Sequence, residues 1–193
     1  MPEENRTSGP RRFAAPIVIV VLVLVVAYIW LRPEVLRVHH TLDSRTDSLL
    51  TQLGDSALVS GDVPVAAVII YDGKVIGEGY NTVMRDHNAA GHAEINAISD
   101  ALGRTGFGTF DRMNRDSLVL VSTFEPCPMC RAAIALYRIK RVEFIKEKSL
   151  LYRLREDASS FVYRLRESLA GNDSLQENLF RKSPEYGTQH KRF

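Results

Sequence analysis

The sequence predicts an α/β domain with three layers (α/β/α) and a mixed central sheet, preceded by one transmembrane helix. Two observations predict this architecture. The segment 14–31 contains no charged residue, and the chain after it alternates between segments of helical and of strand character. Their order is helix, hairpin, helix, strand, helix and strand, which is typical of a layered α/β domain. A length of 193 residues accommodates one such domain with an appendage.

The uncharged segment 14–31 has the length of a membrane span. A helix of this segment would be ~27 Å long at ~1.5 Å per residue, close to the ~30 Å of a bilayer core. Tyr28 and Trp30 near its C-terminal end suit the headgroup region. A cleaved signal peptide is the main alternative, but residues 28–33 lack a small-x-small cleavage site. A buried core helix is a second alternative, but no polar face is present. We therefore expect a single-pass membrane protein of the signal-anchor type.

The side of the membrane on which the domain lies stays open, because arginines flank the segment equally on both sides. They are Arg6, Arg11 and Arg12 before it and Arg32, Arg37 and Arg45 after it. The predicted organisation is an N-terminal tail over 1–13, a transmembrane helix over 14–31, a domain over 32–149 and a C-terminal helical extension over 150–193.

The first half of the domain is predicted to hold one helix and one hairpin. Residues 41–59 carry apolar side chains at helical spacing, and Gly61 and Pro64 close this helix. Two apolar runs, 65–71 and 74–80, flank the dipeptide Asp72-Gly73, and this pattern is a strong hairpin signal.

The second half alternates helices and strands. The glycine-rich, charged stretch 103–116 is predicted to be a loop. The tail 150–179 favours helices, with a break at 171–173. The other expected elements are a helix over 93–102, a strand over 118–122, a helix over 132–137 and a strand over 142–145.

Composition narrows the class of protein. A hydrophobic fraction of 45% with 25% charged residues is ordinary for a globular chain. The net charge of +2 gives no argument for general nucleic-acid binding. The two cysteines, Cys127 and Cys130, lie three residues apart, which excludes a disulfide framework. The two cysteines therefore bind a metal ion, form a redox pair or have this spacing by chance.

Two short motifs carry the chemistry, His92-Ala93-Glu94 and Pro126-Cys127-Pro128-Met129-Cys130. Imidazole and thiolate are preferred zinc ligands, and a catalytic zinc keeps one position for water. His92, Cys127 and Cys130 provide three such ligands for Zn²⁺. Glu94 is close enough to exchange protons with the water without being a ligand.

Each motif has a simpler explanation when taken alone. H-x-E occurs often by chance, and C-x-x-C also forms thioredoxin-like redox pairs, although the residues around Cys127 and Cys130 do not match that motif. Together, with a helix predicted after each, the two motifs match the known pattern of zinc deaminases.

The similarity extends beyond these ligands. From about residue 61 to 146 the chain resembles the cytidine/deoxycytidylate deaminase superfamily, and within it the branch of tRNA adenosine, guanine and yeast-type cytosine deaminases. The segments that carry the resemblance are 61–65, 77–81, 91–95, 124–130 and 138–142. The resemblance implies a cytidine-deaminase-like fold, Zn²⁺ as cofactor and hydrolytic deamination, with the deaminase domain over 32–149.

The same resemblance implies substrate-binding residues. Asn81 matches the asparagine that hydrogen-bonds the substrate in this branch, and its amide both donates and accepts. A turn asparagine that ends a strand is the alternative. The backbone amides around Ala93 and Glu94 are expected to contact the base. Residues 88–91 and 103–116 depart from the usual pattern of the branch, so the base is not identified.

The tail combines arginines with aromatic residues. Stacking on RNA is one interpretation. Because acidic residues are interleaved, an exposed helix face with aromatics in the core or an interface is favoured. The residues concerned are Arg153, Arg155, Arg164, Arg166, Arg181, Lys182, Tyr152, Phe161, Tyr163 and Phe180.

We therefore expect a membrane-anchored, zinc-dependent hydrolase that deaminates an amino-bearing base, nucleoside or nucleotide. The alternatives are deamination of a base in RNA and a non-catalytic zinc module that binds a partner. We expect a small-molecule substrate in preference to RNA. We also expect residues 14–31 to contact the membrane and the chain to form a homodimer. An anchor would provide local substrate or a membrane partner.

Overall fold

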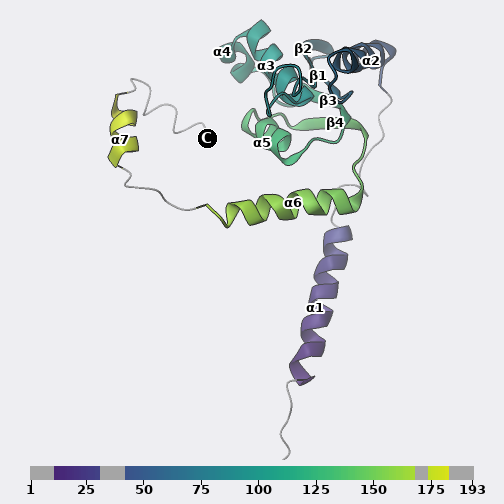
Figure 1. The fold of residues 1–193 in the computed structure, drawn as a ribbon, viewed down its shortest axis with the longest axis vertical. Coiled ribbons are helices and arrows are strands. Elements are labelled where there is room, and N and C mark those ends of the chain that lie inside the picture. Colours follow the sequence, from purple (N-terminus) through teal and green to yellow (C-terminus); the bar gives the residue numbers. More distant parts are fainter. Residues whose placement is uncertain (1–10, 31–41, 168–173, 183–193) are drawn as a thin grey trace, which may run out of the picture. The chain divides into compact units, whose positions relative to one another are not determined.

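The computed structural model describes residues 11–30, 42–167 and 174–182 (Figure 1). The chain forms two compact units, residues 1–42 and residues 43–193. The first unit contains one helix, α1, and the second contains the α/β domain.

Helix α1 spans Arg11–Trp30, so the predicted helix is present. Its role as a membrane span over 14–31 is not supported. Within the described ranges, no helix reaches the length and apolar character that crossing a membrane requires.

The domain is built on a four-stranded mixed sheet in the order β2-β1-β3-β4. Strand β1 pairs antiparallel with β2 and β3, whereas β3 and β4 run parallel. The predicted mixed sheet and α/β class are confirmed. The strands are β1 (Ala66–Tyr71), β2 (Lys74–Tyr80), β3 (Leu118–Phe124) and β4 (Arg141–Lys146).

The predicted hairpin is confirmed as β1 and β2. The turn between them consists of Asp72 and Gly73, whose φ angles are 47° and 74°. Positive φ at both central residues is the geometry of the hairpin turns that follow the twist of the strands, and Asp-Gly is a preferred pair for it.

Helices cover both faces of this sheet. Consecutive residues 66–69 of β1 are all buried, although neighbouring side chains of a strand point to opposite faces. Ala67 and Ile69 belong to one cluster with side chains of α3 (Ala93–Thr105). Val68 points the other way, and α2 (Ser44–Val59) also contacts β1 and β2. The core therefore lies on both sides of the sheet.

Helix α3 lies unusually close to β2. A Cβ added to Gly79 would overlap the carbonyl oxygen of Ala93 and the backbone nitrogen of Ala97. Only glycine fits this approach, because the neighbouring atoms belong to the backbone of α3 and cannot rotate away. The first turn of α3 is therefore fixed against the sheet.

Replacing Gly79 with alanine is expected to lower the free energy of unfolding by about 3 kcal/mol, since α3 must shift to make room. Chemical denaturation measures the change. Gly103→Ala, on the same helix, is the control, because a Cβ there meets nothing within 4 Å. A Gly79→Ala protein as stable as the control would contradict this account of the packing.

The expected loop over 103–116 is wrong. Helix α3 continues to Thr105, and a short helix α4 (Phe107–Arg112) follows Gly106, whose φ is 76°. The physical reason is the burial of Phe110, which is 2% exposed and meets the ring of Tyr137 edge-on at 6.2 Å between centroids. Tertiary packing of this one side chain stabilises a helix that glycine-rich composition argues against.

The remaining helices follow the predicted order. They are α5 (Pro128–Leu136), which begins earlier than expected, α6 (Leu150–Arg164) and α7 (Ser174–Arg181). The predicted break at 171–173 lies outside the described residues. Asp43 caps α2 by accepting from the backbone nitrogens of Arg45 and Thr46.

Candidate active site

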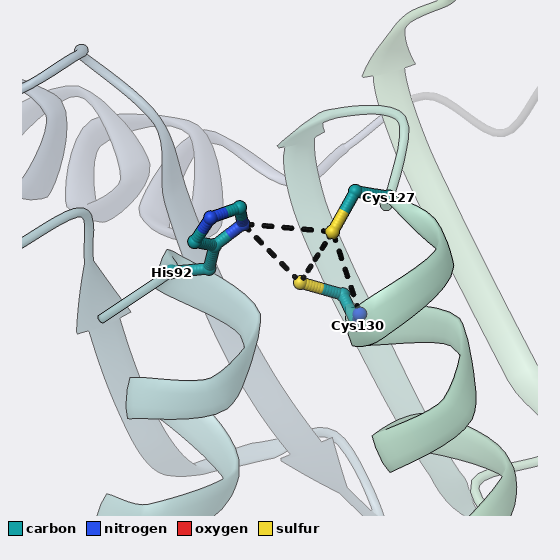
Figure 2. Close-up of side chains that lie close together, drawn as sticks. All are labelled: His92, Cys127 and Cys130. Carbon is teal, nitrogen blue, oxygen red and sulfur yellow. Dashed lines mark hydrogen bonds between the residues drawn. The ribbon is translucent and has the colours of Figure 1, made fainter. Parts of the chain in front are cut away.

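The three predicted metal ligands come together at the N-termini of two neighbouring helices (Figure 2). His92 is the N-cap residue of α3, and Cys127 is the N-cap residue of α5. The Sγ of Cys127 accepts a hydrogen bond from the backbone nitrogen of Cys130, which fixes the first turn of α5. Contacts between α3 and α5 bring the imidazole and the two sulfurs to one point.

The distances between the three ligand atoms fit one tetrahedral metal ion. His92 Nδ1 lies 3.6 Å from the Sγ of Cys127 and 3.6 Å from the Sγ of Cys130. The two sulfurs are 3.4 Å apart. Zinc bonds of about 2.3 Å to sulfur and about 2.0 Å to nitrogen would give tetrahedral edges of about 3.5 Å (N–S) and about 3.8 Å (S–S). The cluster is therefore compatible with Zn²⁺ and leaves the fourth position to another group.

The local electrostatics favour a thiolate at Cys127. Hydrogen bonds from Cys130 and His92 hold the pKa of Cys127 well below its usual range. The same hydrogen bond to Cys127, together with burial, raises the pKa of Cys130. The hydrogen bond to Cys127 raises the pKa of His92. Negative charge is thus held at the N-terminus of α5, where the helix dipole favours it.

Glu94 lies beside this cluster and is 3% exposed. Its Oε2 accepts from the Sγ of Cys130 at 3.4 Å. Burial raises the pKa of Glu94, because a carboxylate loses hydration there. A buried carboxyl group next to a metal cluster is suited to accepting and donating protons.

A cavity of about 410 Å³ opens beside the cluster and contains most of the predicted site residues. Asn81, His92, Ala93, Glu94 and Cys127 all line it, whereas Cys130 is buried and does not. Further lining residues are Gly61, Asp62, Val63, Val65, Val83, Met84, Phe124, Glu125, Lys148, Tyr152 and Glu156. The structure thus brings the predicted ligands, acid–base residue and substrate-binding residues to one pocket.

Asp62 contributes to the site in a way that sequence reasoning did not identify. Its Oδ1 accepts from the backbone nitrogen of Met84 at 2.7 Å, and its Oδ2 accepts from that of Arg85 at 3.2 Å. Burial alone would raise the pKa of Asp62, but these hydrogen bonds lower it below the usual value. These two hydrogen bonds hold the loop after β2 against the wall of the cavity.

Asn96 was also missed. Its side chain donates to the carbonyl oxygen of Tyr80 at 2.8 Å and to Oγ1 of Thr82 at 3.1 Å. These two residues flank Asn81, so Asn96 fixes the backbone on both sides of it. An asparagine inside a predicted helix is a weak sequence signal, and only the approach of α3 to β2 reveals its partner.

The third missed contribution comes from α6. Tyr152 and Glu156 line the cavity, together with Lys148 before the helix. The sequence pattern predicts an extension beyond the domain from residue 150 onwards. In the structure, this extension forms part of the wall of the pocket.

Comparison with known proteins identifies the same region of the chain. Residues 43–146 match the family model described as "Cytidine and deoxycytidylate deaminase zinc-binding region". The chain is 38% identical to tRNA-specific adenosine deaminase 2 of Xenopus tropicalis over 96 residues, which cover 48% of this chain and 55% of that protein. It is 36% identical to guanine deaminase of Bacillus subtilis over 109 residues, covering 56% and 65% of the two chains.

Among solved structures, guanine deaminase from Bacillus subtilis is similar, with a TM-score of 0.53 and 26% identity. That match covers 75% of this chain and 99% of the other. The chain matches between about half and two thirds of the length of the two curated relatives named above.

Proposed function

Because this chain belongs to the cytidine and deoxycytidylate deaminase family, whose zinc-binding region it matches over residues 43–146, we propose that it is a zinc-dependent hydrolase. It removes the amino group of a nucleobase, either free or within a nucleoside or nucleotide. The observation that carries this proposal is the position of Glu94. A buried carboxyl group lies within 3.4 Å of the ligand cluster and lines the cavity that contains Asn81.

His92, Cys127 and Cys130 would hold the metal, since their ligand atoms already have the required separations. When bound, zinc supplies a hydrolytic water with a pKa lowered to about 7. The protein has to place the base beside that position and move protons.

Glu94 moves the protons. As a base, it takes one from the attacking water. It delivers this proton to the ring nitrogen, takes a second proton from the hydroxyl group that the attack adds to the ring, and delivers that one to the amino group, which leaves as ammonia. The burial that raises its pKa stabilises the protonated form between these two transfers.

Asn81 and the first turn of α3 orient the base. The amide of Asn81 donates and accepts, as the edge of a base requires. Ala93 lines the cavity at the start of α3, where backbone N–H groups have no partner within the helix.

Replacing Asn81 with alanine is expected to lower kcat/KM by about 10- to 100-fold, because a hydrogen-bonding edge of the base then lacks its partner. Steady-state kinetics on the best substrate measures the loss. Asn114→Ala, an exposed asparagine outside the cavity, serves as the control. If Asn81→Ala leaves kcat/KM unchanged, Asn81 is a turn residue at the end of β2.

The test of the function is ammonia release by the purified, zinc-loaded protein from free bases, nucleosides and 5′-monophosphates. Turnover of at least one of them supports the proposal. If none of them is turned over, with zinc bound and the domain folded, a small-molecule substrate is overturned and RNA substrates are tested next; no turnover of RNA either favours the non-catalytic zinc module.

A base within RNA is the second candidate substrate, because several of the relatives are named as tRNA-specific adenosine deaminases. Salt-dependent binding of RNA would favour it, since contacts to phosphates release counterions. A homodimer stays a prediction.

A further inference from the structure

One side of the cavity is formed by a pair of opposite charges from the C-terminal part of the domain. Both carboxylate oxygens of Glu156 accept from Nζ of Lys148 at 2.9 Å. The lysine side chain is only 4% exposed, and that of Glu156 is 18% exposed. The ammonium also lies 5.8 Å from the ring centre of Phe124 and 5.5 Å from that of Tyr152. Lys148 is therefore enclosed by its partners.

The position of this pair is fixed by the fold. The backbone nitrogen of Lys148 donates to Oε2 of the buried Glu125 at 2.9 Å, and Glu125 directly precedes the cysteine motif. Tyr152 and Glu156 are four residues apart on α6, so they share one face of that helix. Glu125 thus connects the position of this pair to the segment that carries Cys127 and Cys130.

The charges of this wall do not suit a phosphate. Among the described residues that line the cavity, Lys148 is the one lysine or arginine, whereas the carboxyl groups are Asp62, Glu94, Glu125 and Glu156. Glu156 already neutralises Lys148. The nearby Arg131 reaches Glu125 and Asp157 instead of the cavity, at 3.0 Å and 3.4 Å. A phosphate placed there would meet carboxyl groups, and the ammonium of Lys148 is already held by Glu156.

The size of the cavity does not by itself exclude a phosphate. A volume of about 410 Å³ falls within the usual range of small-molecule sites and leaves space around a base. A bound metal adds no surplus charge, because the two thiolates balance a divalent ion. Selection against phosphate therefore depends on the carboxylates.

We propose that Glu156 is a specificity-determining residue that restricts this site to uncharged substrates, a free base or a nucleoside, and disfavours their 5′-phosphates. Because Glu156 pairs with the ammonium of Lys148, this cation is not available to bind a phosphate. This inference rests on the proposed function and narrows its substrate class.

Calorimetric titration tests the inference on the zinc-loaded, full-length Glu94→Gln protein, which binds substrate without consuming it. The probes are cytidine, adenosine and guanosine, each paired with its 5′-monophosphate. We expect the nucleoside that the wild-type enzyme deaminates to bind at least tenfold more tightly than its monophosphate. Adding Glu156→Gln should reduce this ratio by about tenfold, because Lys148 can then donate a charge-assisted hydrogen bond to phosphate.

Two matched variants separate this effect from a general loss of charge. Asp157→Asn removes a carboxylate from the next position of α6, outside the cavity, and should leave the ratio unchanged. Lys148→Met combined with Glu156→Gln should show no gain for the monophosphate, since the gain needs the ammonium. Should Glu156→Gln fail to fold, the ratio measured on the Glu94→Gln protein alone still tests whether the site disfavours the monophosphate, and equal affinities overturn the inference.

The outcomes are distinguishable. A monophosphate that binds as tightly as its nucleoside, or a ratio that Glu156→Gln does not change, overturns the inference while leaving the deaminase intact. The absence of both binding and turnover for every base, nucleoside and nucleotide overturns the proposed function itself.

Discussion

Replacing Glu94 with glutamine is expected to reduce the rate of ammonia release by about 10²- to 10⁴-fold, the usual contribution of a positioned acid–base group. Glutamine keeps the shape of the side chain but neither takes nor delivers a proton. Because Glu94 is buried beside Cys130 and is not one of the three ligands, zinc binding should survive the change. The loss should therefore appear in kcat, and KM should change little.

The measurement is steady-state turnover together with the zinc content of the same preparation. Glu143→Gln, a change to a carboxylate of β4 outside the cavity, is the control. A Glu94→Gln protein that retains zinc and more than a tenth of the wild-type rate would assign the proton transfers to another group. Loss of zinc in the variant would instead show that Glu94 supports the ligand cluster.

The site was more predictable from the sequence than its surroundings were, and the reason is local geometry. His92 and Glu94 occupy the first residues of one helix, and Cys127 and Cys130 those of another. The position of each side chain follows from a few neighbouring residues, so short motifs suffice to predict it. The Asp72-Gly73 hairpin was predictable for the same reason.

Features that depend on distant contacts were not predictable. Helix α4 exists because Phe110 packs against Tyr137, and nothing within 107–112 indicates that contact. The part played by Glu156 in the cavity depends on Lys148 and on the path of the chain after β4. The role of 14–31 was predicted from local hydropathy and flanking residues; the helix is present, and among the described residues no helix is long and apolar enough to cross a membrane.

Removing any one of the three ligands is expected to abolish zinc binding and activity together. A site with three protein ligands has none to spare. Even the loss of a group that merely supports a ligand costs about 10- to 100-fold in metal affinity, so His92→Ala, Cys127→Ser and Cys130→Ser should each exceed that. Zinc content after dialysis should fall from about one ion per chain towards none, and turnover should fall with it. His87→Ala, an exposed histidine on the loop after β2, should retain both.

Chelation of the wild-type protein should have the same effect, and added Zn²⁺ should reverse it. The domain should stay folded without metal, because its core cluster of Ile69, Ala97, Leu120 and their neighbours includes none of the three ligands. The melting temperature should nevertheless fall, since a ligand that binds the native state stabilises it. A redox pair predicts the opposite pattern for Cys127 and Cys130. In that case chelators would leave the activity intact, whereas thiol oxidants and reductants would control it.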